Sequence, residues 1–485
     1  MKILNRDNLT FDDVLLLPQK SETLPKNINL KTNLVKGFSL NIPLISADMD
    51  TVTESLLAIT LARLGGLGVI HKNLSPNEQA KEINKVKRSE STLIIDPITL
   101  APEDLVEKAI KTMKQHNISG IPIIKNKKLV GILTHRDLRF IENEQIQIKK
   151  VMTKKLITAP IKTSIEKAKA ILYKHRIEKL PLINKKGELK GLITIKDIQK
   201  FVDYPLANKD KDGRLRVAAS IGVGEEALTR AQKVIEAKVD CLVISTAHGH
   251  SKMVIETIKK IRRKYPKIIL MAGNVATREG VKSLAKAGAQ LIKVGIGPGS
   301  TCTTRAITGG GVPQLTAIIE CAKEARKNKV GIIADGGIRY SGDITKALAA
   351  GAKAVMMGNL FAGTDESPGE LIYHNNKTYK SYRGMGSLGA LKKGSKERYN
   401  QQSNGPAKLV PEGIEGRVLY KGPLFKVTDQ LTGGLCSGMG LSGAKDIPDL
   451  QKKAKFILIS KQAIEESHPH NIMITEQAPN YPGRL

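Results

Sequence analysis

The fold of this chain is decided by residues 268–295, which read IILMAGNVATREGVKSLAKAGAQLIKVG. Two short apolar runs, IILMAG and LIKVG, stand at the two ends, and the segment between them has apolar residues at helical spacing. A strand, a helix and a second strand in this order form a βαβ unit with parallel strands. The two runs are almost wholly apolar, which is typical of strands buried on both faces. The stretch therefore predicts one unit of a parallel α/β fold.

The same unit recurs along most of the chain. Helical patterns, such as those at 53–64 and 225–237, follow apolar runs that predict strands. These runs lie at residues 42–46, 67–70, 217–222, 241–246, 268–273, 291–295, 330–335 and 353–358. The two early runs and the six later ones make eight, the number that closes a parallel barrel. We therefore predict the α/β class and a (β/α)8 TIM barrel.

A tandem repeat interrupts the predicted barrel between its second and third strands. Residues 118–138 read ISGIPIIKNKKLVGILTHRDL, and residues 177–198 read IEKLPLINKKGELKGLITIKDI. Each copy predicts a hairpin and follows an amphipathic helical pattern, at 103–117 and at 164–176. The pair resembles a tandem of CBS modules, which typically bind adenine or guanine nucleotides between the copies. The resemblance makes a purine nucleotide a candidate ligand; a role in contacts between subunits is the alternative.

These features divide the chain into a split barrel and an inserted module. The barrel covers 1–91 and 204–485, and the CBS module covers 92–203. Within the module, the first copy spans about 93–150 and the second spans about 154–203.

A stretch rich in Gly and Lys covers residues 381–444 and contains few apolar residues. Long segments without regular structure inside a folded chain are usually functional or disordered. We predict that this stretch forms a mobile flap over the barrel mouth.

The composition is that of a folded protein with an unusual charge. Among 485 residues, 41% are apolar and 26% are charged, which excludes a disordered chain. Lys and Arg number 78 against 46 Asp and Glu, so the formal net charge is +32. The lysines are scattered over every segment, which favours a general drift toward lysine or an attraction for small anionic ligands. Trp is absent and aromatic residues make up 4%, so stacking surfaces are scarce and nucleic acid is not an expected partner.

The cysteines and the apolar runs point to the cytoplasm. The four cysteines, at 241, 302, 321 and 436, have no CxxC spacing, which argues against a zinc site or a redox pair. Few, scattered cysteines in a long chain are typical of a reducing compartment. The N-terminal residues carry charges where a signal peptide is apolar, and no apolar run approaches the length of a membrane span. We expect a cytoplasmic protein without a membrane partner.

The loop after the sixth predicted strand carries a candidate nucleophile. Residues 295–305 read GIGPGSTCTTR, and their three glycines allow the backbone to approach a ligand closely. Cys302 stands among polar residues and near Arg305, a setting that favours the thiolate. A structural cysteine is more often found inside an apolar run, as Cys241 is. We predict that Cys302 is a nucleophile, with an inert thiol as the alternative.

The next two loops predict a site for a phosphorylated ligand. Asp335 ends a strand and is followed by Gly336 and Gly337, so its carboxylate could accept hydrogen bonds from the two hydroxyls of a ribose. Gly358 follows the last strand and opens a helix, whose first backbone N–H groups favour a phosphate. Each signal is weak alone, because glycine is also common in tight turns, but the loops stand together with the Cys302 loop.

Specific motifs then point to a family. The segments GIGPGSTCTTR, ADGGIRYSGD, SYRGMGSLGA, KERY and PEGIEGRV have the order and spacing found in inosine-5′-monophosphate (IMP) dehydrogenase. MDTVTE at 49–54 and GGLGVIHKN at 65–73 are similar to the N-terminal barrel segments of that family. The resemblance covers essentially the whole chain. It implies the NAD-dependent oxidation of IMP to XMP, the committed step of guanine nucleotide synthesis.

The resemblance also implies a mechanism in two steps. The cysteine matched by Cys302 adds to C2 of the purine, hydride leaves to NAD, and a covalent thioimidate results. The flap then moves into the space that the reduced cofactor leaves, and water hydrolyses the thioimidate. The arginine matched by Arg398 acts as the base of this step, with Tyr399 beside it.

The family's binding residues are carried over position by position. Those for IMP fall at Ser300, Gly358, Asn359 and Tyr382 around the phosphate, at Asp335, Gly336 and Gly337 on the ribose, at Met49, Met385, Gly386 and Glu412 near the purine, and at Arg383 and Gly384. Those for NAD fall at Ser245, Asn274, Gly295, Ile296 and Gly297. A potassium ion is implied at the carbonyls of Gly297, Gly299 and Cys302, completed by Glu466, Ser467 and His468 of a neighbouring subunit. This shared site implies a homotetramer, and assembly through the CBS modules would give an octamer.

Three positions depart from the family's usual pattern. Ser245 stands where an Asp usually binds the cofactor ribose, so weaker binding of NAD is expected. Asn359 stands where Ser usually contacts the phosphate. Asp48 stands where a small neutral residue or Pro is usual. None of these departures removes a reacting group.

Two other functions fit parts of the sequence. Guanosine monophosphate (GMP) reductase shares the barrel, the cysteine loop and the ribose Asp, but usually lacks the CBS insertion and the KERY flap. A nucleotide-sensing or nucleic-acid-binding protein built on this scaffold is suggested by the net charge of +32 and by Ser245.

Overall fold

The computed structural model describes residues 8–90, 94–95, 97–116, 118–399, 401, 409–481 and 483. The chain forms two compact units. One comprises Met1–Ser89, Leu206–Asn208 and Leu215–Leu485, and the other comprises Glu90–Pro205 and Lys209–Arg214. In the described part of the chain, no helix has both the length and the apolar character that crossing a membrane requires.

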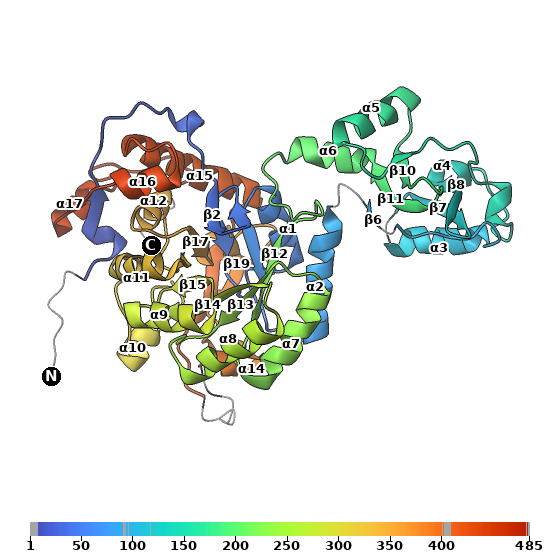
Figure 1. Ribbon diagram of the computed structural model, residues 1–485. Coiled ribbons are helices and arrows are strands. Elements are labelled where there is room, and N and C mark those ends of the chain that lie inside the picture. The colour runs from blue at the N-terminus through green and yellow to red at the C-terminus, as the bar shows by residue number, and fades with distance from the viewer. Residues whose placement is uncertain are drawn as a thin grey trace. The chain divides into compact units, whose positions relative to one another are not determined.

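The larger unit contains a closed barrel of eight parallel strands, which confirms the predicted fold (Figure 1). The strands are β4 (Leu44–Ser46), β5 (Leu67–Ile70), β12 (Val217–Ile221), β13 (Cys241–Ser245), β14 (Ile269–Val275), β15 (Leu291–Val294), β16 (Gly331–Asp335) and β17 (Ala354–Met357). Each begins within two residues of its predicted start. Val69 of β5 pairs with Ala218 of β12, so the barrel is continuous across the inserted segment. Met356 pairs with Ile45 and closes the ring.

Helices alternate with these strands along the chain. They are α1 (Ser55–Arg63), α2 (Pro76–Ser89), α7 (Gly224–Glu236), α8 (Lys252–Lys264), α9 (Arg278–Ala287), α10 (Thr304–Thr308), α11 (Gln314–Asn328), α12 (Ser341–Ala349) and α13 (Asn359–Ala362). Helix α9 shows why the sequence forms them. Thr277 caps its first turn by accepting a hydrogen bond from Gly280 N at 3.2 Å, Val281 and Leu284 face the core, and Gly288 ends it in the left-handed conformation.

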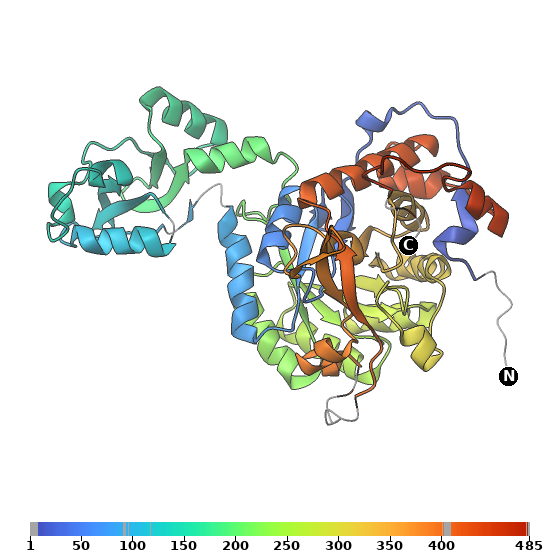
Figure 2. The ribbon, with the colours of Figure 1, turned by 180° about the vertical axis from the view of Figure 1, so that it is seen from behind.

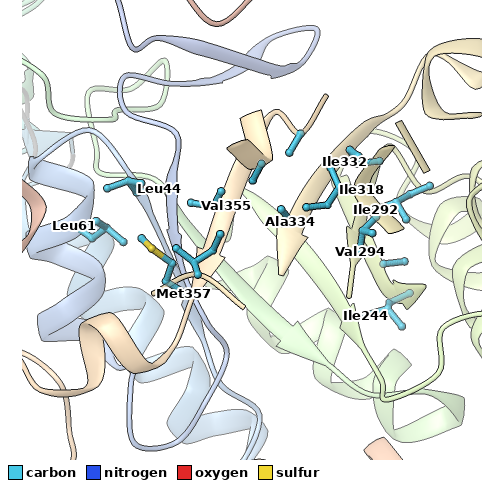
Figure 3. Packing of buried hydrophobic residues seen from close by; sticks show 14 of the residues in the cluster. Leu44, Leu61, Ile244, Ile292, Val294, Ile318, Ile332, Ala334, Val355 and Met357 are labelled. Carbon is cyan, nitrogen blue, oxygen red and sulfur yellow. The ribbon is translucent and has the colours of Figure 1, made fainter. Parts of the chain in front are cut away.

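Alternation along the strands divides the barrel residues between two hydrophobic cores. Ile292, Ile332 and Val355 point outward and form one cluster with helix residues such as Leu61 and Ile318 (Figure 3). The intervening strand residues point inward and form a second cluster, which includes Ile45, Val69, Val243, Met271, Leu291, Ile333 and Met356. Strands buried on both faces explain the nearly continuous apolar runs in the sequence.

A hairpin covers the amino-terminal end of the barrel. Strands β2 (Thr32–Val35) and β3 (Phe38–Leu40) contribute Leu34, Phe38 and Leu40 to the inner cluster. Thr32 Oγ1 donates a hydrogen bond of 2.7 Å to the carbonyl of Lys353, the residue just before β17. The carboxyl end of the barrel is therefore left for the loops that follow the strands.

The remaining elements of this unit surround the barrel. Strands β18 (Leu371–His374), β19 (Lys377–Arg383) and β20 (Glu415–Leu419) form an antiparallel sheet, which Figure 2 shows in orange. The others are β1 (Val14–Leu16), β21 (Phe456–Leu458), α14 (Leu388–Lys392), α15 (Leu424–Leu441), α16 (Ile447–Lys453), α17 (Lys461–Glu466) and the 3₁₀ helices η1 (Phe11–Asp13), η2 (Pro25–Asn27) and η4 (Ser395–Tyr399).

The predicted extent of the flap is wrong at its C-terminal end. Residues 424–441 were expected to lack regular structure but form α15, which buries Leu424, Leu431, Leu435 and Met439 in the main core. Their spacing of four and seven residues places them on one face of a helix. The glycines of this segment hide the pattern in the sequence, because glycine is normally unfavourable inside a helix.

The smaller unit contains the predicted repeat. The first hairpin is β7 (Gly120–Lys125) with β8 (Lys128–Thr134), and the second is β10 (Lys179–Ile183) with β11 (Leu189–Thr194). Pro122 and Pro181 occupy equivalent positions, paired with Ile132 and Leu192. Each copy has its own hydrophobic cluster. The other elements are β6 (Ile94–Ile95), β9 (Ala159–Pro160), α3 (Val106–His116), α4 (His135–Leu138), α5 (Ile165–His175), α6 (Ile195–Asp203) and η3 (Ile148–Lys150).

Candidate active site

A cavity lies at the carboxyl ends of the barrel strands, where TIM barrels carry their ligand sites. Its walls come from the carboxyl ends of five strands, β4, β13, β14, β15 and β16, from the loops that follow them, and from the flap. The predicted residues that line it are Met49, Asn274, Gly295, Ile296, Gly297, Gly299, Cys302, Asp335, Gly336, Tyr382, Gly384, Met385, Gly386, Arg398, Tyr399 and Glu412. Segments far apart in the sequence thus meet at one site.

The strands present polar side chains where the inner apolar core ends. Ser245, Lys293 and Asp335 continue the inward-pointing sets of β13, β15 and β16, whose earlier members are apolar. Asn274 lies within an irregularity in the pairing of β14 with β15, between Ala272 and Val275. A layer of polar groups therefore forms the floor of the cavity.

Lys293 is the centre of this layer and is fully buried. Its Nζ lies 2.9 Å from Ser245 Oγ, 3.3 Å from Asp48 Oδ1 and 3.3 Å from Asp335 Oδ2. A buried ammonium group is tolerated only when it is paired and hydrogen-bonded, as it is here. Lys293 was not predicted from the sequence, although a charged residue inside an apolar strand was a signal that could have found it.

Asp335 and Asn274 are held together beside the cavity. Asn274 Nδ2 donates hydrogen bonds of 2.8 Å to Asp335 Oδ2 and to the carbonyl of Gly295. Asn274 Oδ1 is buried without a hydrogen-bond partner. A buried acceptor in this condition is costly, so it fits a donor group brought by a ligand.

Cys302 lies in the loop between β15 and α10 and borders the cavity. Its Sγ lies 3.1 Å from Thr304 Oγ1, and its backbone N–H donates to the Gly299 carbonyl at 3.0 Å. The flap reaches this loop, because Thr303 N donates to the carbonyl of Glu412 at 2.9 Å. Thr304, which was not predicted from the sequence, is thus the nearest polar partner of the thiol.

The other cysteines have a different environment. Cys241 and Cys321 are buried, and burial raises the pKa of both thiols, that of Cys321 to about 12. Burial also raises the pKa of Cys436 on α15. These three thiols are poor nucleophiles at neutral pH.

Arg305 shapes the Cys302 loop. Its guanidinium donates to the carbonyls of Ile296 at 3.0 Å and Val312 at 2.5 Å, so it fixes the path of the backbone. Burial lowers the pKa of Arg305. Gly297 has a φ of +79°, and a Cβ there would lie 3.0 Å from Arg305 Cδ. This position requires glycine for conformation as well as for space.

The flap segment η4 is docked into the barrel mouth. Glu397 accepts hydrogen bonds from Lys72 Nζ at 2.7 Å and from the backbone N–H of Val223. The carbonyl of Arg398 accepts from Ala247 N at 3.0 Å. Arg398 Nη1 donates to Ser245 Oγ at 2.7 Å and to Asp48 Oδ2 at 3.1 Å. The arginine nominated for hydrolysis therefore lies inside the cavity.

Tyr399 follows Arg398 and also borders the cavity. Burial raises its pKa to about 12, and the adjacent Arg398 acts in the opposite direction. A Cβ at Gly386 would lie 2.8 Å from the Tyr399 hydroxyl, so the two flap segments touch where Gly386 lacks a side chain.

The predicted phosphate region brings three segments together. The Tyr382 hydroxyl lies 3.8 Å from Met49 Sδ, and a Cβ at Gly358 would lie 2.9 Å from that hydroxyl. Burial raises the pKa of Tyr382, and hydrogen bonds with Ser300 and Thr301 act against it. Gly358 precedes α13, which begins at Asn359.

Several predicted residues lie outside the lining of the cavity. Gly337, Gly358, Asn359 and Ser300 do not line it, and Ser245 is fully buried and accepts a hydrogen bond from Arg398 Nη1. Arg383 forms a two-point ion pair with Asp50, at 2.5 and 3.1 Å, which ties β19 to the loop after β4. Glu466, Ser467 and His468 lie at the end of α17, where His468 Nδ1 is 2.8 Å from the Tyr481 hydroxyl.

No group of three or more His, Cys, Asp and Glu side chains that could hold a metal ion is present among the described residues. The backbone carbonyl of Gly299 accepts a hydrogen bond of 3.0 Å from the backbone N–H of Cys302. Neutral carbonyl oxygens are ligands for hard cations and not for zinc or copper.

Comparisons with known proteins identify the family of the chain. A family model described as "IMP dehydrogenase / GMP reductase domain" matches residues 8–470. Inosine-5′-monophosphate dehydrogenases of Staphylococcus aureus strains Mu50 and MW2 are 57% identical over 480 residues, which is 98% of this chain and 98% of theirs. A crystal structure of a cysteine-to-alanine variant of GMP reductase from Trypanosoma brucei, in complex with guanosine 5′-monophosphate, matches with a TM-score of 0.88 and 37% identity.

The last match bears on the inserted module. It covers 97% of this chain and 99% of the GMP reductase chain, so that reductase spans the insertion as well. The presence of the module therefore does not separate the two activities, contrary to the sequence-based expectation. The match of the family over most of the chain, together with the cavity that joins Cys302, Asp335 and Arg398, leads to one assignment. The chain belongs to the IMP dehydrogenase / GMP reductase family.

Proposed function

We propose that this chain oxidises IMP to XMP with NAD, using Cys302 as a covalent nucleophile. The observation that carries the proposal is the single cavity in which Cys302, Asp335 and the flap pair Arg398 and Tyr399 come together. The near-complete alignment with inosine-5′-monophosphate dehydrogenases at 57% identity supports the same reaction. The carboxyl-end loops and the flap together supply the lining of the proposed substrate site.

The substrate is held at its ribose and its phosphate. Asp335 is oriented by Asn274 and Lys293, which leaves it as an acceptor for ribose hydroxyls. Tyr382, with Ser300 beside it, stands near Gly358 for the phosphate. Glu412, brought to the cavity by the flap, can accept a hydrogen bond from the purine N1–H, which favours hypoxanthine over adenine.

The first chemical step forms a covalent intermediate. The Cys302 thiolate donates an electron pair to C2 of IMP, so that a carbon–sulfur bond forms and the C2=N3 π bond opens onto N3; the pair on N3 re-forms this bond when hydride leaves. The C2 hydrogen then leaves with its electron pair as hydride, and a thioimidate remains on the enzyme. Asn274, Gly295 and Ile296 line the side where NAD would bind, and NAD, when bound, supplies the acceptor for that hydride. Asn274 Oδ1, buried without a partner, fits a hydrogen-bond donor there.

The second step releases the product. A water molecule attacks C2, the carbon–sulfur bond breaks, and the thiolate of Cys302 leaves, so that XMP carries oxygen at C2. Arg398 and Tyr399 are the flap groups at the cavity that accept or relay the proton of this water. Arginine is normally always protonated, so its use as a base rests on the family resemblance.

The docked flap and bound NAD would occupy the same part of the cavity. Arg398 hydrogen-bonds Ser245, one of the positions matched to the NAD ribose contact, and it docks on Ala247. Hydride transfer therefore requires the flap to leave the cavity so that NAD can bind. Hydrolysis requires the flap to be docked in the cavity. The docked arrangement described here is the one suited to hydrolysis.

A monovalent cation fits the Cys302 loop. The carbonyls of Gly297, Gly299 and Cys302 are the donors for potassium, with Glu466, Ser467 and His468 of a neighbouring copy completing the site in a homotetramer. The left-handed φ of Gly297 and its contact with Arg305 support a rigid loop whose carbonyl directions are fixed. We also propose that the CBS pair binds a purine nucleotide and that the CBS modules can join tetramers into an octamer. The proposed location is the cytoplasm.

The second candidate is reduction of GMP, which the 37% identical GMP reductase structure favours. The two reactions share the covalent step, but only oxidation of IMP needs a hydrolytic base on the flap. The purified protein is assayed with IMP and NAD and, separately, with GMP and NADPH. We expect NADH and XMP from the first pair. Turnover of the second pair alone would reassign the chain as a reductase, and no turnover of either would favour a binding function.

A further inference from the structure

Two neighbouring positions at the cavity floor face the same two cations. Asp48 Oδ1 lies 3.3 Å from Lys293 Nζ, and its Oδ2 lies 3.1 Å from Arg398 Nη1. Ser245 Oγ lies 2.9 Å from the same Lys293 atom and 2.7 Å from the same Arg398 atom. A carboxylate at either position would therefore pair with both cations. In this chain the charge stands at position 48 and the hydroxyl at position 245.

Asp48 is the anion that holds the Arg398 guanidinium. Within the described residues it is the only carboxylate within 4.0 Å of that group. Burial pushes the pKa of Asp48 upward, but Lys293 and Arg398 outweigh it and keep the pKa well below its ordinary value. Arg398 Nε is buried without a hydrogen-bond partner. The hydrogen bonds of the guanidinium to Asp48 and to Ser245 are both made by Nη1.

Docking of the flap backbone does not depend on Asp48. Glu397 is held by Lys72 and by the backbone of Val223, and the carbonyl of Arg398 is held by Ala247 N. These contacts fix η4 whether or not residue 48 is charged. Removing the carboxylate would therefore take away the anionic partner of Arg398 Nη1 and leave the Ser245 hydroxyl there, while the flap stays docked.

We infer that Asp48 is a positioning residue for the hydrolytic step, because it fixes the Arg398 guanidinium at the cavity in place of a carboxylate at position 245. The inference rests on the proposed function of the flap. According to this inference, hydride transfer does not require Asp48, because the flap is undocked during that step. It also predicts that the charge can be moved between the two positions without loss of its effect.

The first test replaces Asp48 and separates the two chemical steps. In Asp48→Asn and Asp48→Ala, rapid mixing with IMP and NAD should still give a burst of about one NADH per site. Steady-state turnover should fall on the order of tenfold to a hundredfold, as expected when a reacting group is misplaced. Intact mass spectrometry during turnover should show the thioimidate on Cys302 accumulating above the wild-type level.

The matched control is Asp240→Asn. Asp240 is also a largely buried carboxylate paired with a lysine, because its Oδ2 lies 2.5 Å from Lys87 Nζ, but it directly precedes β13 and does not line the cavity. Its substitution should lower the thermal stability and leave the ratio of burst to steady-state rate unchanged. This variant separates the loss of a buried ion pair from the loss of a positioned arginine.

The second test moves the charge. Asp48→Ala with Ser245→Asp restores one carboxylate facing Lys293 and Arg398, so turnover should recover to within a few-fold of wild type. Ser245→Asp alone places two carboxylates against the same cations, and their repulsion should give no gain in turnover. Because the double variant keeps the buried charge balance, it also remains informative if Asp48→Ala folds poorly.

Three outcomes would overturn the inference. The first is unchanged turnover in Asp48→Asn, and the second is loss of the NADH burst, which would place Asp48 in hydride transfer. The third is a double variant no faster than Asp48→Ala, which would show that position 245 cannot carry the charge. Failure of the proposed function itself has a different signature, because wild-type protein would then form no thioimidate from IMP.

Discussion

Cys302 combines access to the cavity with a hydroxyl partner at 3.1 Å, whereas burial raises the pKa of the other three thiols. In Cys302→Ala we expect no NADH from IMP, because C2 can no longer be attacked, while IMP still binds through Asp335 and Tyr382. Stopped-flow absorbance measures the NADH and calorimetry measures the binding. The control Cys436→Ala should retain full activity. NADH formation by Cys302→Ala at an appreciable fraction of the wild-type rate would exclude covalent catalysis by this residue.

Arg398 reaches the cavity only when η4 is docked, so its effect should be confined to hydrolysis. Arg398→Ala should keep an NADH burst of about one per site and then turn over slowly, with the thioimidate accumulating. Arg417 offers a control on the same flap, because it is exposed and its guanidinium stacks on Tyr379 at 4.9 Å. Arg417→Ala should behave as wild type. Loss of the burst in Arg398→Ala would instead assign Arg398 to hydride transfer or to folding.

At the scale of single elements, α15 shows how close packing depends on individual glycines. A Cβ at Gly434 would lie 2.6 Å from Ser341 Cβ on α12, whereas a Cβ at Gly433 would meet nothing within 4 Å. Gly434→Ala should therefore lower the free energy of unfolding by about 1–3 kcal/mol through overpacking. Gly433→Ala should raise it by about 0.5–1 kcal/mol, because alanine loses less backbone entropy in a helix. Chemical denaturation measures both, and equal effects of the two changes would contradict close packing of α15 on α12.

At the scale of the whole molecule, the catalytic cavity belongs entirely to the larger unit. The strands on either side of the insertion, β5 and β12, pair directly with each other. Replacing residues 92–203 with a short Gly/Ser linker should therefore preserve oxidation of IMP, since the ring of strands remains closed. Any response of the wild-type enzyme to ATP or GTP should disappear. Steady-state assays with and without these nucleotides make the comparison, and a folded but inactive deletion would assign the module a role in the chemistry.

The barrel could be predicted from the sequence alone, because strands buried on both faces carry unbroken apolar runs and each run is a local signal. It also pointed to Cys302, Asp335 and the flap, since their motifs are contiguous in the chain. Helix α15 was missed because its glycines suggest a loop, and only the packing against α12 shows why they are there. The lysine at position 293 inside an apolar run was a signal in the sequence, but its role depends on Asp48, Ser245 and Asp335, which only the tertiary structure brings around it. In the sequence, Asp48 and Ser245 looked like two unrelated departures from the family's pattern. They are 197 positions apart, and local patterns do not reveal contacts between residues so distant in the chain. Only the tertiary structure shows that the two side chains face the same two cations.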